Sequence, residues 1–246
     1  MKKGLLLLDE TDQWVALNKP AGLLSVPDRE GKEASLKSQL QKKYGKIWPV
    51  HRLDRDTSGV ILFAKNEEAH RYFSMQFEQR GVQKRYGGLV IGKPLPLEGS
   101  ITSPIKEHHA IIGKMVTHRS GKPSQTNYIV AEQFAPYSWV LFKPITGRTH
   151  QIRVHMQSIG CPLACDNLYG DAQPLYLSRL KSNYKISKNQ EEERPLLNRL
   201  ALHAMELTFT DLGGETITLQ AELPKELQVT LLQLRKYSRQ TLPRSR

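Results

Sequence analysis

Residues 51–59, HRLDRDTSG, place acidic side chains among cations in a chain that is already basic. Asp54 lies between Arg52 and Arg55, and Asp56 follows directly after. A carboxylate beside cations stays ionised, because an opposite charge nearby lowers its pKa. Such a carboxylate can form a structural ion pair, bind a metal, or act as a general base or a nucleophile. From these residues alone, an ion pair or a turn organised by Asp56 is the favoured interpretation.

Two further segments combine cations with planar side chains. Lys84, Arg85 and Tyr86 precede a predicted strand, and residues 146–155, TGRTHQIRVH, pass from a loop into a predicted helix. Arginine and lysine bind phosphates, and tyrosine can stack on a base. Three such segments, each beside the start of a strand or helix, are better explained by one nucleic-acid groove than by chance.

The composition also favours a polyanionic partner. The 246 residues carry a formal net charge of +12, which suits nucleic acid. The sequence contains no long amphipathic basic helix of the kind that binds an anionic membrane surface. No apolar run approaches the roughly 20 residues that span a bilayer, and Asp9 and Glu10 end the short apolar start too early for a signal peptide. We therefore expect nucleic-acid binding, no membrane association and a cytoplasmic location.

The cysteines and acidic residues do not indicate a metal or a cofactor. Cys161 and Cys165 are too few for a disulfide framework, and their spacing is not that of a zinc pair. No acidic or histidine cluster stands at ligand spacing near Asp54, and no glycine-rich phosphate motif is present. We expect two free thiols, no metal and no cofactor.

The elements that must position these segments follow an α+β pattern, with many short strands and a few helices between them. Strands are predicted at residues 5–8, 14–17, 59–63, 89–91, 126–130, 139–142, 206–209 and 216–219. One helix should begin after the N-cap Asn66, and a second should cover about residues 149–158. A third should contain Leu227, Leu231 and Leu234.

One domain over residues 1–240 fits this pattern, because no internal repeat divides the chain and 39% hydrophobic residues can form a sizeable core. Residues 178–199 are polar and aperiodic, which predicts a mobile loop inside the domain. Residues 241–246 are expected to form a flexible tail.

Five segments, taken in order, resemble the RluA family of pseudouridine synthases. HRLDRDTSG is similar to the central family motif, H-R-L-D-x-x-T-S-G, which is highly specific. The full set is NKPAGLLSVP at residues 18–27, HRLDRDTSG at 51–59, KRY at 84–86, KPITGRTHQIRVH at 143–155 and LHA at 202–204. The resemblance extends from about residue 9 to about residue 222.

The resemblance implies an enzyme that breaks the glycosidic bond of a uridine in RNA, turns the base and rejoins C1′ to C5. It implies an α+β catalytic domain with a long, mixed, mostly antiparallel sheet, flanking helices and a central active-site cleft. Asp54 would be the catalytic carboxylate, and Arg153 would pair with it. Tyr86 would lie against the target base and could act in deprotonating C5. The residues assigned to substrate binding are Arg52, Arg55, Lys84, Arg148, Gln151 and Leu202.

Neither the mechanism nor the substrate is fully specified by the resemblance. Asp54 could attack C1′ or C6, or the reaction could pass through a glycal. Because the entry strand begins by Asp9, the sequence leaves no room for the small N-terminal RNA-binding domain that many relatives carry. Residues 22–27 and 121–126 resemble a dual-specificity member. We expect 23S ribosomal RNA, transfer RNA or both as substrate, and a monomer.

One departure from the family pattern concerns a turn. The family usually has H-P-L-x-G-D-x-x-Y-G, whereas residues 161–170 read CPLACDNLYG, so Cys165 replaces a glycine. Glycine reaches a positive φ at little cost, so the shape of this turn is in question. Asp166 and Tyr169 remain in place.

Three other functions could use some of the same residues. A non-catalytic RNA-binding module would use the same basic residues, and it predicts that Asp54→Asn leaves function intact. A protein kinase is disfavoured, because the chain lacks G-x-G-x-x-G and D-F-G motifs. A glycosidase would need two converging carboxylates, and Asp54 and Asp56 need not converge at i, i+2 spacing.

Overall fold

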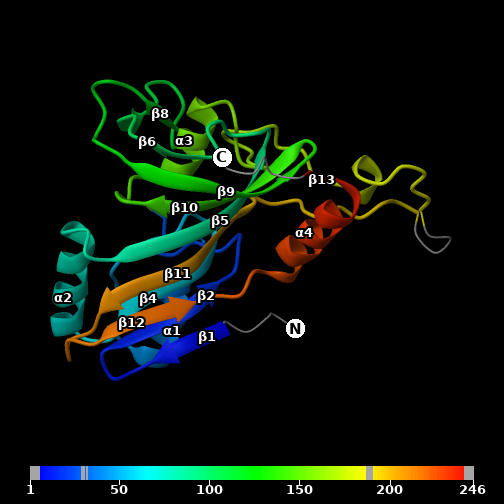
Figure 1. Cartoon of the computed structure of the whole chain (residues 1–246). Coiled ribbons are helices and arrows are strands. Elements are labelled where there is room, and N and C mark those ends of the chain that lie inside the picture. Colours follow the sequence, from blue (N-terminus) through cyan, green and yellow to red (C-terminus); the bar gives the residue numbers. More distant parts are fainter. Residues whose placement is uncertain (1–5, 29–30, 32, 187–190, 241–246) are drawn as a thin grey trace. The chain divides into compact units, whose positions relative to one another are not determined.

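The computed structural model describes residues 6–28, 31, 33–186 and 191–240 (Figure 1). The predicted tail at residues 241–246 and part of the predicted loop, residues 187–190, lie outside these ranges. The chain forms two compact units. Unit 1 comprises Met1–Tyr86 and His203–Glu222, and unit 2 comprises Gly87–Leu202 and Leu223–Arg246.

The sheet of unit 1 has strand order β1-β2-β4-β11, and β11 is followed by β5. Its strands are β1 (Leu6–Glu10), β2 (Trp14–Lys19), β3 (Trp48–Pro49), β4 (Ser58–Ala64), β11 (Leu202–Thr210) and β12 (Thr216–Gln220), with the first residues of β5 (Gln83–Ile91). β4 is central, and all of its residues are buried. It pairs antiparallel with β2 and parallel with β11. The motif HRLDRDTSG therefore leads directly into the most buried strand of the unit.

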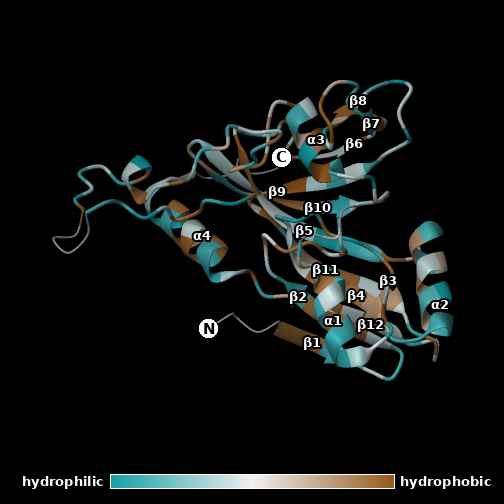
Figure 2. Cartoon of the chain, turned by 180° about the vertical axis from the view of Figure 1, so that it is seen from behind, coloured by the Kyte–Doolittle hydropathy of each residue, from teal (hydrophilic) through white to brown (hydrophobic). Residues whose placement is uncertain are grey.

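Both faces of β2 and β4 are covered, which explains the continuous apolar runs of these strands (Figure 2). On one face, Val60 and Leu62 pack with Phe73 of helix α2 (Glu67–Glu78). On the other face, Ile61 and Phe63 pack with the apolar side of helix α1 (Leu36–Tyr44). Alternate residues of one strand thus serve two separate cores.

The helices of unit 1 begin at polar caps. The Asn66 side chain accepts a hydrogen bond from the Ala69 N–H at 2.8 Å, so the predicted start of α2 is confirmed. Helix α1 was not predicted. Its buried residues are Leu36 and Leu40 only, and this short apolar stripe is a weak periodic signal among six polar or charged neighbours.

Unit 2 has a second run of the sheet, with strand order β5-β10-β9-β13, and β6 also pairs with β9. Its strands are β6 (Glu98–Ile101), β7 (Ile105–Glu107), β8 (Met115–Thr117), β9 (Thr126–Phe134), β10 (Tyr137–Pro144) and β13 (Arg239–Gln240), and its helices are α3 (Gln151–Ser158), the 3-10 turn η1 (Leu177–Arg179) and α4 (Lys225–Tyr237). β7 and β8 form a separate antiparallel hairpin. Val154 of α3 packs with Ile105 of β7 and with Tyr169.

The predicted α+β class and the mixed, mostly antiparallel sheet are confirmed. Two boundaries differ from the predictions. Lys84, Arg85 and Tyr86 lie inside β5 and not before it, because the strand continues past its polar half. Helix α3 begins at Gln151, since the preceding His150 has a left-handed φ of 54° that no helix interior accepts.

The segment at residues 178–199 carries little regular structure among its described residues. The 3-10 turn η1 overlaps its start, and an isolated bridge joins Leu175 to Leu197. The described residues of this segment are mostly irregular, and the mobile loop stays a prediction. Among the helices that the structure describes, none has the length and apolar character needed to cross a membrane.

Candidate active site

The backbone on either side of Asp54 is held by side chains from residues 18–27. The Ser25 Oγ donates a hydrogen bond to the Leu53 carbonyl at 2.7 Å and accepts one from the Leu53 N–H at 3.1 Å. The Thr57 N–H closes a turn onto the Asp54 carbonyl at 3.2 Å. Because both the N–H and the carbonyl of Leu53 are hydrogen bonded, the backbone that carries the partly buried Asp54 side chain is held in place.

Lys19 holds the other side of the same loop. Its ammonium group is fully buried and donates to three carbonyl groups, those of Pro20 at 3.0 Å, Leu23 at 2.7 Å and Arg55 at 2.9 Å. The Arg55 carbonyl also accepts from the Gly22 N–H at 2.9 Å. Three carbonyl acceptors match the three protons of an ammonium group, which satisfies a charge that would otherwise be costly to bury.

Tyr86 lies within the electrostatic reach of Asp54. Burial, with the negative charge of Asp54 as a second cause, raises the pKa of the Tyr86 phenol well above its usual value. The phenol is therefore protonated at neutral pH and can pack against a base as a neutral ring. Its predicted part in deprotonating C5 stays a prediction, and a neutral phenol is a weak proton acceptor.

His51 opens the motif as a neutral structural residue. Its Nε2 accepts a hydrogen bond from the Leu62 N–H at 3.0 Å, and its ring stacks on Phe77 with centroids 4.7 Å apart. Burial, assisted by the nearby positive charge of Lys84, lowers the pKa of His51 to about 3. Burial also lowers the pKa of Lys84. His51 thus attaches the start of the motif to β4, a role that sequence reasoning missed.

The two arginines of the motif face solvent. Arg52 and Arg55 are both exposed, and Arg55 forms a surface ion pair with Glu33 at 3.2 Å. Exposed pairs of this kind contribute little stability, so Arg55 can exchange Glu33 for a phosphate at small cost. Exposure agrees with the predicted RNA contacts of both arginines, which stay predictions.

In unit 2, Gln151 is buried and its amide is bound by protein groups. Its Oε1 accepts from the Thr146 hydroxyl at 2.6 Å and from the Arg148 N–H at 3.0 Å. Its Nε2 donates to the Gln125 carbonyl and the Thr126 Oγ1, both at 2.9 Å. These four bonds use the full capacity of the amide, which suits a residue that shapes the loop around Arg148. The predicted contact of Gln151 with substrate stays a prediction.

Arg153 forms a bidentate ion pair with Asp166. Its Nε and Nη2 donate to the two carboxylate oxygens at 2.8 Å each, and both side chains are buried. Burial alone would raise the pKa of Asp166, but the hydrogen bonds and charge of Arg153 hold it below the usual value. The predicted pairing of Arg153 with Asp54 stays a prediction. Sequence reasoning missed Asp166 as a partner, although its place in the CDNLYG stretch was visible.

The turn that precedes Asp166 keeps the conformation of a glycine. Cys165 has a φ of 56°, in the left-handed region, so the cysteine adopts the backbone that the family glycine would reach cheaply. Burial raises the pKa of the Cys165 thiol to about 11 and also raises that of Cys161. Both cysteines are free thiols, as predicted, and their raised pKa values favour the protonated form.

Leu202, the remaining predicted binding residue, is buried at the start of β11. The next residue, His203, hydrogen bonds through Nδ1 to the Ser58 Oγ at 2.8 Å and through Nε2 to the Ala221 carbonyl at 3.2 Å. The end of the motif is thereby joined to β11. The predicted packing of Leu202 in the substrate pocket, like the predicted central cleft, stays a prediction.

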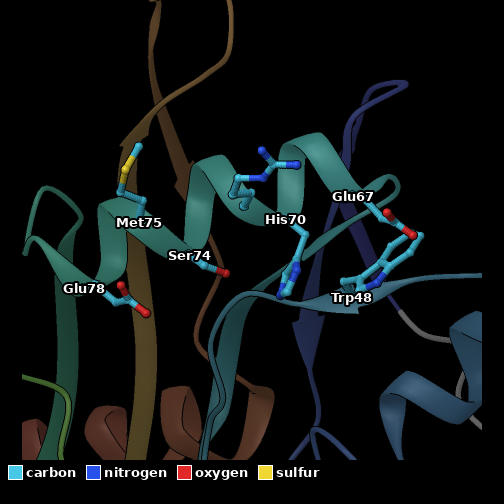
Figure 3. A pocket seen from close by; sticks show the side chains of 7 residues that line it. Trp48, Glu67, His70, Ser74, Met75 and Glu78 are labelled. Atoms are coloured by element: carbon cyan, nitrogen blue, oxygen red, sulfur yellow. The ribbon is translucent and has the colours of Figure 1, made fainter.

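A shallow pocket of about 650 Å³ lies along α2, where Trp48 of β3 approaches the helix (Figure 3). Its lining residues are Trp48, Glu67, His70, Arg71, Ser74, Met75 and Glu78. None of the predicted site residues lines it. In the part of the chain that the structure describes, no group of three or more histidine, cysteine, aspartate or glutamate side chains is placed to hold a metal ion.

Comparison with known proteins identifies the family. Residues 13–158 match the family model described as RNA pseudouridylate synthase. The dual-specificity RNA pseudouridine synthase RluA of Escherichia coli (strain K12) is 38% identical over 221 residues, which cover 88% of this chain and 92% of that protein. Ribosomal large subunit pseudouridine synthase C of the same strain is 37% identical over 240 residues, covering 94% of this chain and 70% of that protein.

Solved structures show the same fold. Human RNA Pseudouridylate Synthase Domain Containing 1 has a TM-score of 0.73 and 27% sequence identity, covering 99% of this chain and 91% of its own. Human RNA Pseudouridylate Synthase Domain Containing 4 has a TM-score of 0.70 and 27% identity, covering 94% and 93%. With its motifs, its fold and these similarities, the chain belongs to the RluA family of RNA pseudouridine synthases.

Proposed function

We propose that this enzyme converts specific uridines of ribosomal and transfer RNA to pseudouridine, with Asp54 as the catalytic carboxylate. The observation that carries the proposal is the loop around Asp54, whose flanking peptide groups are bound by Ser25, Lys19 and Gly22. A nucleophile or base needs a backbone that is held in place, so that its side chain meets the target atom in a reactive geometry. Tyr86, whose pKa is raised by burial and by the Asp54 charge, would cover a base held there.

The reaction needs no redox step. The glycosidic C1′–N1 bond breaks, the uracil turns, and a C1′–C5 bond forms. The proton on C5 is lost and N1 gains one, so the product is an isomer of the substrate. Asp54 would assist by attack at C1′ or C6, or by promoting a glycal route, and these routes remain open. Arg153 and Leu202 complete the proposed catalytic and binding set.

The substrate class is proposed from the relatives and the charge. The similar E. coli proteins are named for dual-specificity RNA and for the large ribosomal subunit. A target base stacked in folded RNA must be flipped out at a cost of a few kcal/mol. Phosphate contacts from a chain of net charge +12, including Arg52, Arg55, Lys84 and Arg148, would offset that cost. We propose a cytoplasmic monomer.

Carbodiimide-based mapping of pseudouridine tests the proposal. Total RNA would be compared from the parent strain, a deletion strain, and strains carrying Asp54→Asn or the matched control Asp56→Asn. One or a few positions should vanish in the deletion and in Asp54→Asn, and remain in Asp56→Asn. Positions that vanish only in the deletion would identify an RNA-binding module that works without catalysis.

A further inference from the structure

The strongest unexplained feature of unit 2 is the buried ion pair between Arg153 and Asp166. The side chains are 6% and 0% exposed, so both charges are removed from water. Replacing such a pair with apolar side chains is often neutral or stabilising, because burial costs each ion several kcal/mol. Stability is therefore a weak reason for this pair, and a role in orienting one of the two groups is the stronger one.

Asp166 is itself held by the backbone. Besides both bonds from Arg153, its Oδ1 accepts hydrogen bonds from the Leu168 N–H at 2.9 Å and the Tyr169 N–H at 3.1 Å. The left-handed turn at Cys165 sets the direction of the chain just before it. A carboxylate with this many fixed donors cannot swing, so the direction of the guanidinium follows from the turn.

Tyr169 supports the same guanidinium from its face. The ring centroid lies 4.9 Å from the Arg153 Cζ, in cation–π contact. The Tyr169 hydroxyl accepts from the Met115 N–H at 2.7 Å and lies 2.9 Å from the His150 Nδ1. The hydroxyl is therefore bound at the tip of the ring, and the hydrogen bond from the Tyr169 N–H to Asp166 holds the residue at its backbone. The ring is thus fixed at both ends.

Because the guanidinium is planar, these contacts fix the direction in which its other N–H groups point. Asp166 occupies the edge formed by Nε and Nη2, so Nη1 and the second Nη2 hydrogen point away from the carboxylate. A lysine in place of Arg153 would have no such fixed second edge. The direction of the remaining donors is therefore a property of the pair, not of Arg153 alone.

We propose that Asp166 is a positioning residue, which aims Arg153 for the isomerisation without touching RNA itself. This inference rests on the proposed function, because it assigns Arg153 to the reaction. A purely structural alternative is that the pair only attaches α3 to residues 161–170. The two hypotheses differ in whether the effect of an Asp166 substitution on the reaction rate depends on Arg153.

Single-turnover rates of the purified protein, measured on the RNA that pseudouridine mapping identifies, distinguish the two hypotheses. Asp166→Asn keeps the size of the side chain and an oxygen for the two backbone amides, but loses the charge and one acceptor for Arg153. The rate should fall roughly 10- to 100-fold, as expected for a misplaced group, while the Kd for RNA changes less than about 3-fold. Glu132→Gln, at the surface bidentate pair with Arg235, is the matched control and should leave the rate unchanged.

A double-mutant cycle tests whether the effect of Asp166→Asn on the rate depends on Arg153. In an Arg153→Lys background, Asp166→Asn should lower the rate by less than about 3-fold further, because the aimed group is already gone. An equal loss in both backgrounds, or no loss in the single variant, would overturn the positioning role. If Asp166→Asn does not fold, Asp166→Glu carries the same test, since it keeps the charge but shifts the carboxylate by one methylene. A wild-type protein without pseudouridine formation would instead refute the proposed function.

Discussion

At the scale of single residues, the loop that carries Asp54 depends on an interior cation. The Lys19 ammonium is the shared donor for the carbonyls of Pro20, Leu23 and Arg55. This places a positive charge in the interior of the protein and not on its surface. The charge contributes to holding the geometry, which separates Lys19 in function from the exposed Arg52 and Arg55.

Lys19→Met should lower the free energy of unfolding by roughly 2–4 kcal/mol, because the carbonyls of Pro20 and Leu23 lose a buried donor. Activity should fall together with stability, since the Asp54 loop loses the contact of the Lys19 ammonium with the Arg55 carbonyl. Urea denaturation measures the first effect. The control is Lys42→Met on the exposed side of α1, where a change within about 0.5 kcal/mol is expected.

His51 makes stability depend on pH. Its folded pKa of about 3 lies below the ordinary value of 6.5, so the unfolded chain binds more protons between those values. Stability is therefore complete above about pH 6.5 and is lost as the pH falls toward 3, by at most about 1.4 kcal/mol per unit. Burial lowers the pKa of His155 too, and the sign is the same.

Chemical denaturation at pH 7, 6 and 5 measures this slope, in a window above most carboxylate titrations. His51→Gln, which keeps an acceptor for the Leu62 N–H, should reduce the slope between pH 6.5 and 5. An unchanged slope would show that His51 is not the residue responsible.

At the scale of elements, the motif residue Gly59 allows β4 and β11 to meet. Gly59 has a φ of 119°, and a Cβ built on it would lie 2.1 Å from the Ala204 carbonyl oxygen. Ala204 is its partner in the parallel pairing of the two strands. Any side chain at this position would separate the strand that follows Asp54 from its neighbour.

Gly59→Ala should destabilise the protein by at least about 4 kcal/mol, because losses of this size are typical of a severe steric conflict in the core. Thermal unfolding measures it, with Gly160→Ala as control. Gly160 also has a positive φ, 75°, but no atom lies within 4 Å of its built Cβ, so only the backbone cost of about 1–2 kcal/mol is expected. Equal effects of the two substitutions would contradict the close approach.

At the scale of the whole molecule, the net charge of +12 makes RNA affinity depend on salt. Each phosphate contact contributes about 0.7–0.9 to the slope of log K against log salt. Arg52→Ala should reduce the slope by about one contact. Arg71→Ala, at another exposed arginine on α2 outside the five motif segments, should leave the slope unchanged. Fluorescence anisotropy over a salt series measures both slopes, and equal slopes would remove Arg52 from the RNA-contact set.

The α+β class, most strands, the start of α2 and the family could be predicted from the amino-acid sequence alone. These follow from local information: strand periods, an N-cap, and a motif whose residue types and order are specific. The candidate residues Asp54, Tyr86 and Arg153 came from the same motifs. Their chemistry could be named because it depends on side-chain type.

Which groups support these residues could be learned only from the folded chain. The Lys19 ammonium meets a carbonyl 36 residues away, and Ser25 binds a carbonyl 28 residues away. Arg153 meets Asp166, and the amide of Gln151 is used inside the protein. Such partners depend on how strands and turns bring distant residues together, and a single sequence carries no direct signal for that. Side-chain direction and burial, and hence the pKa of His51 and Tyr86, are set at the same step.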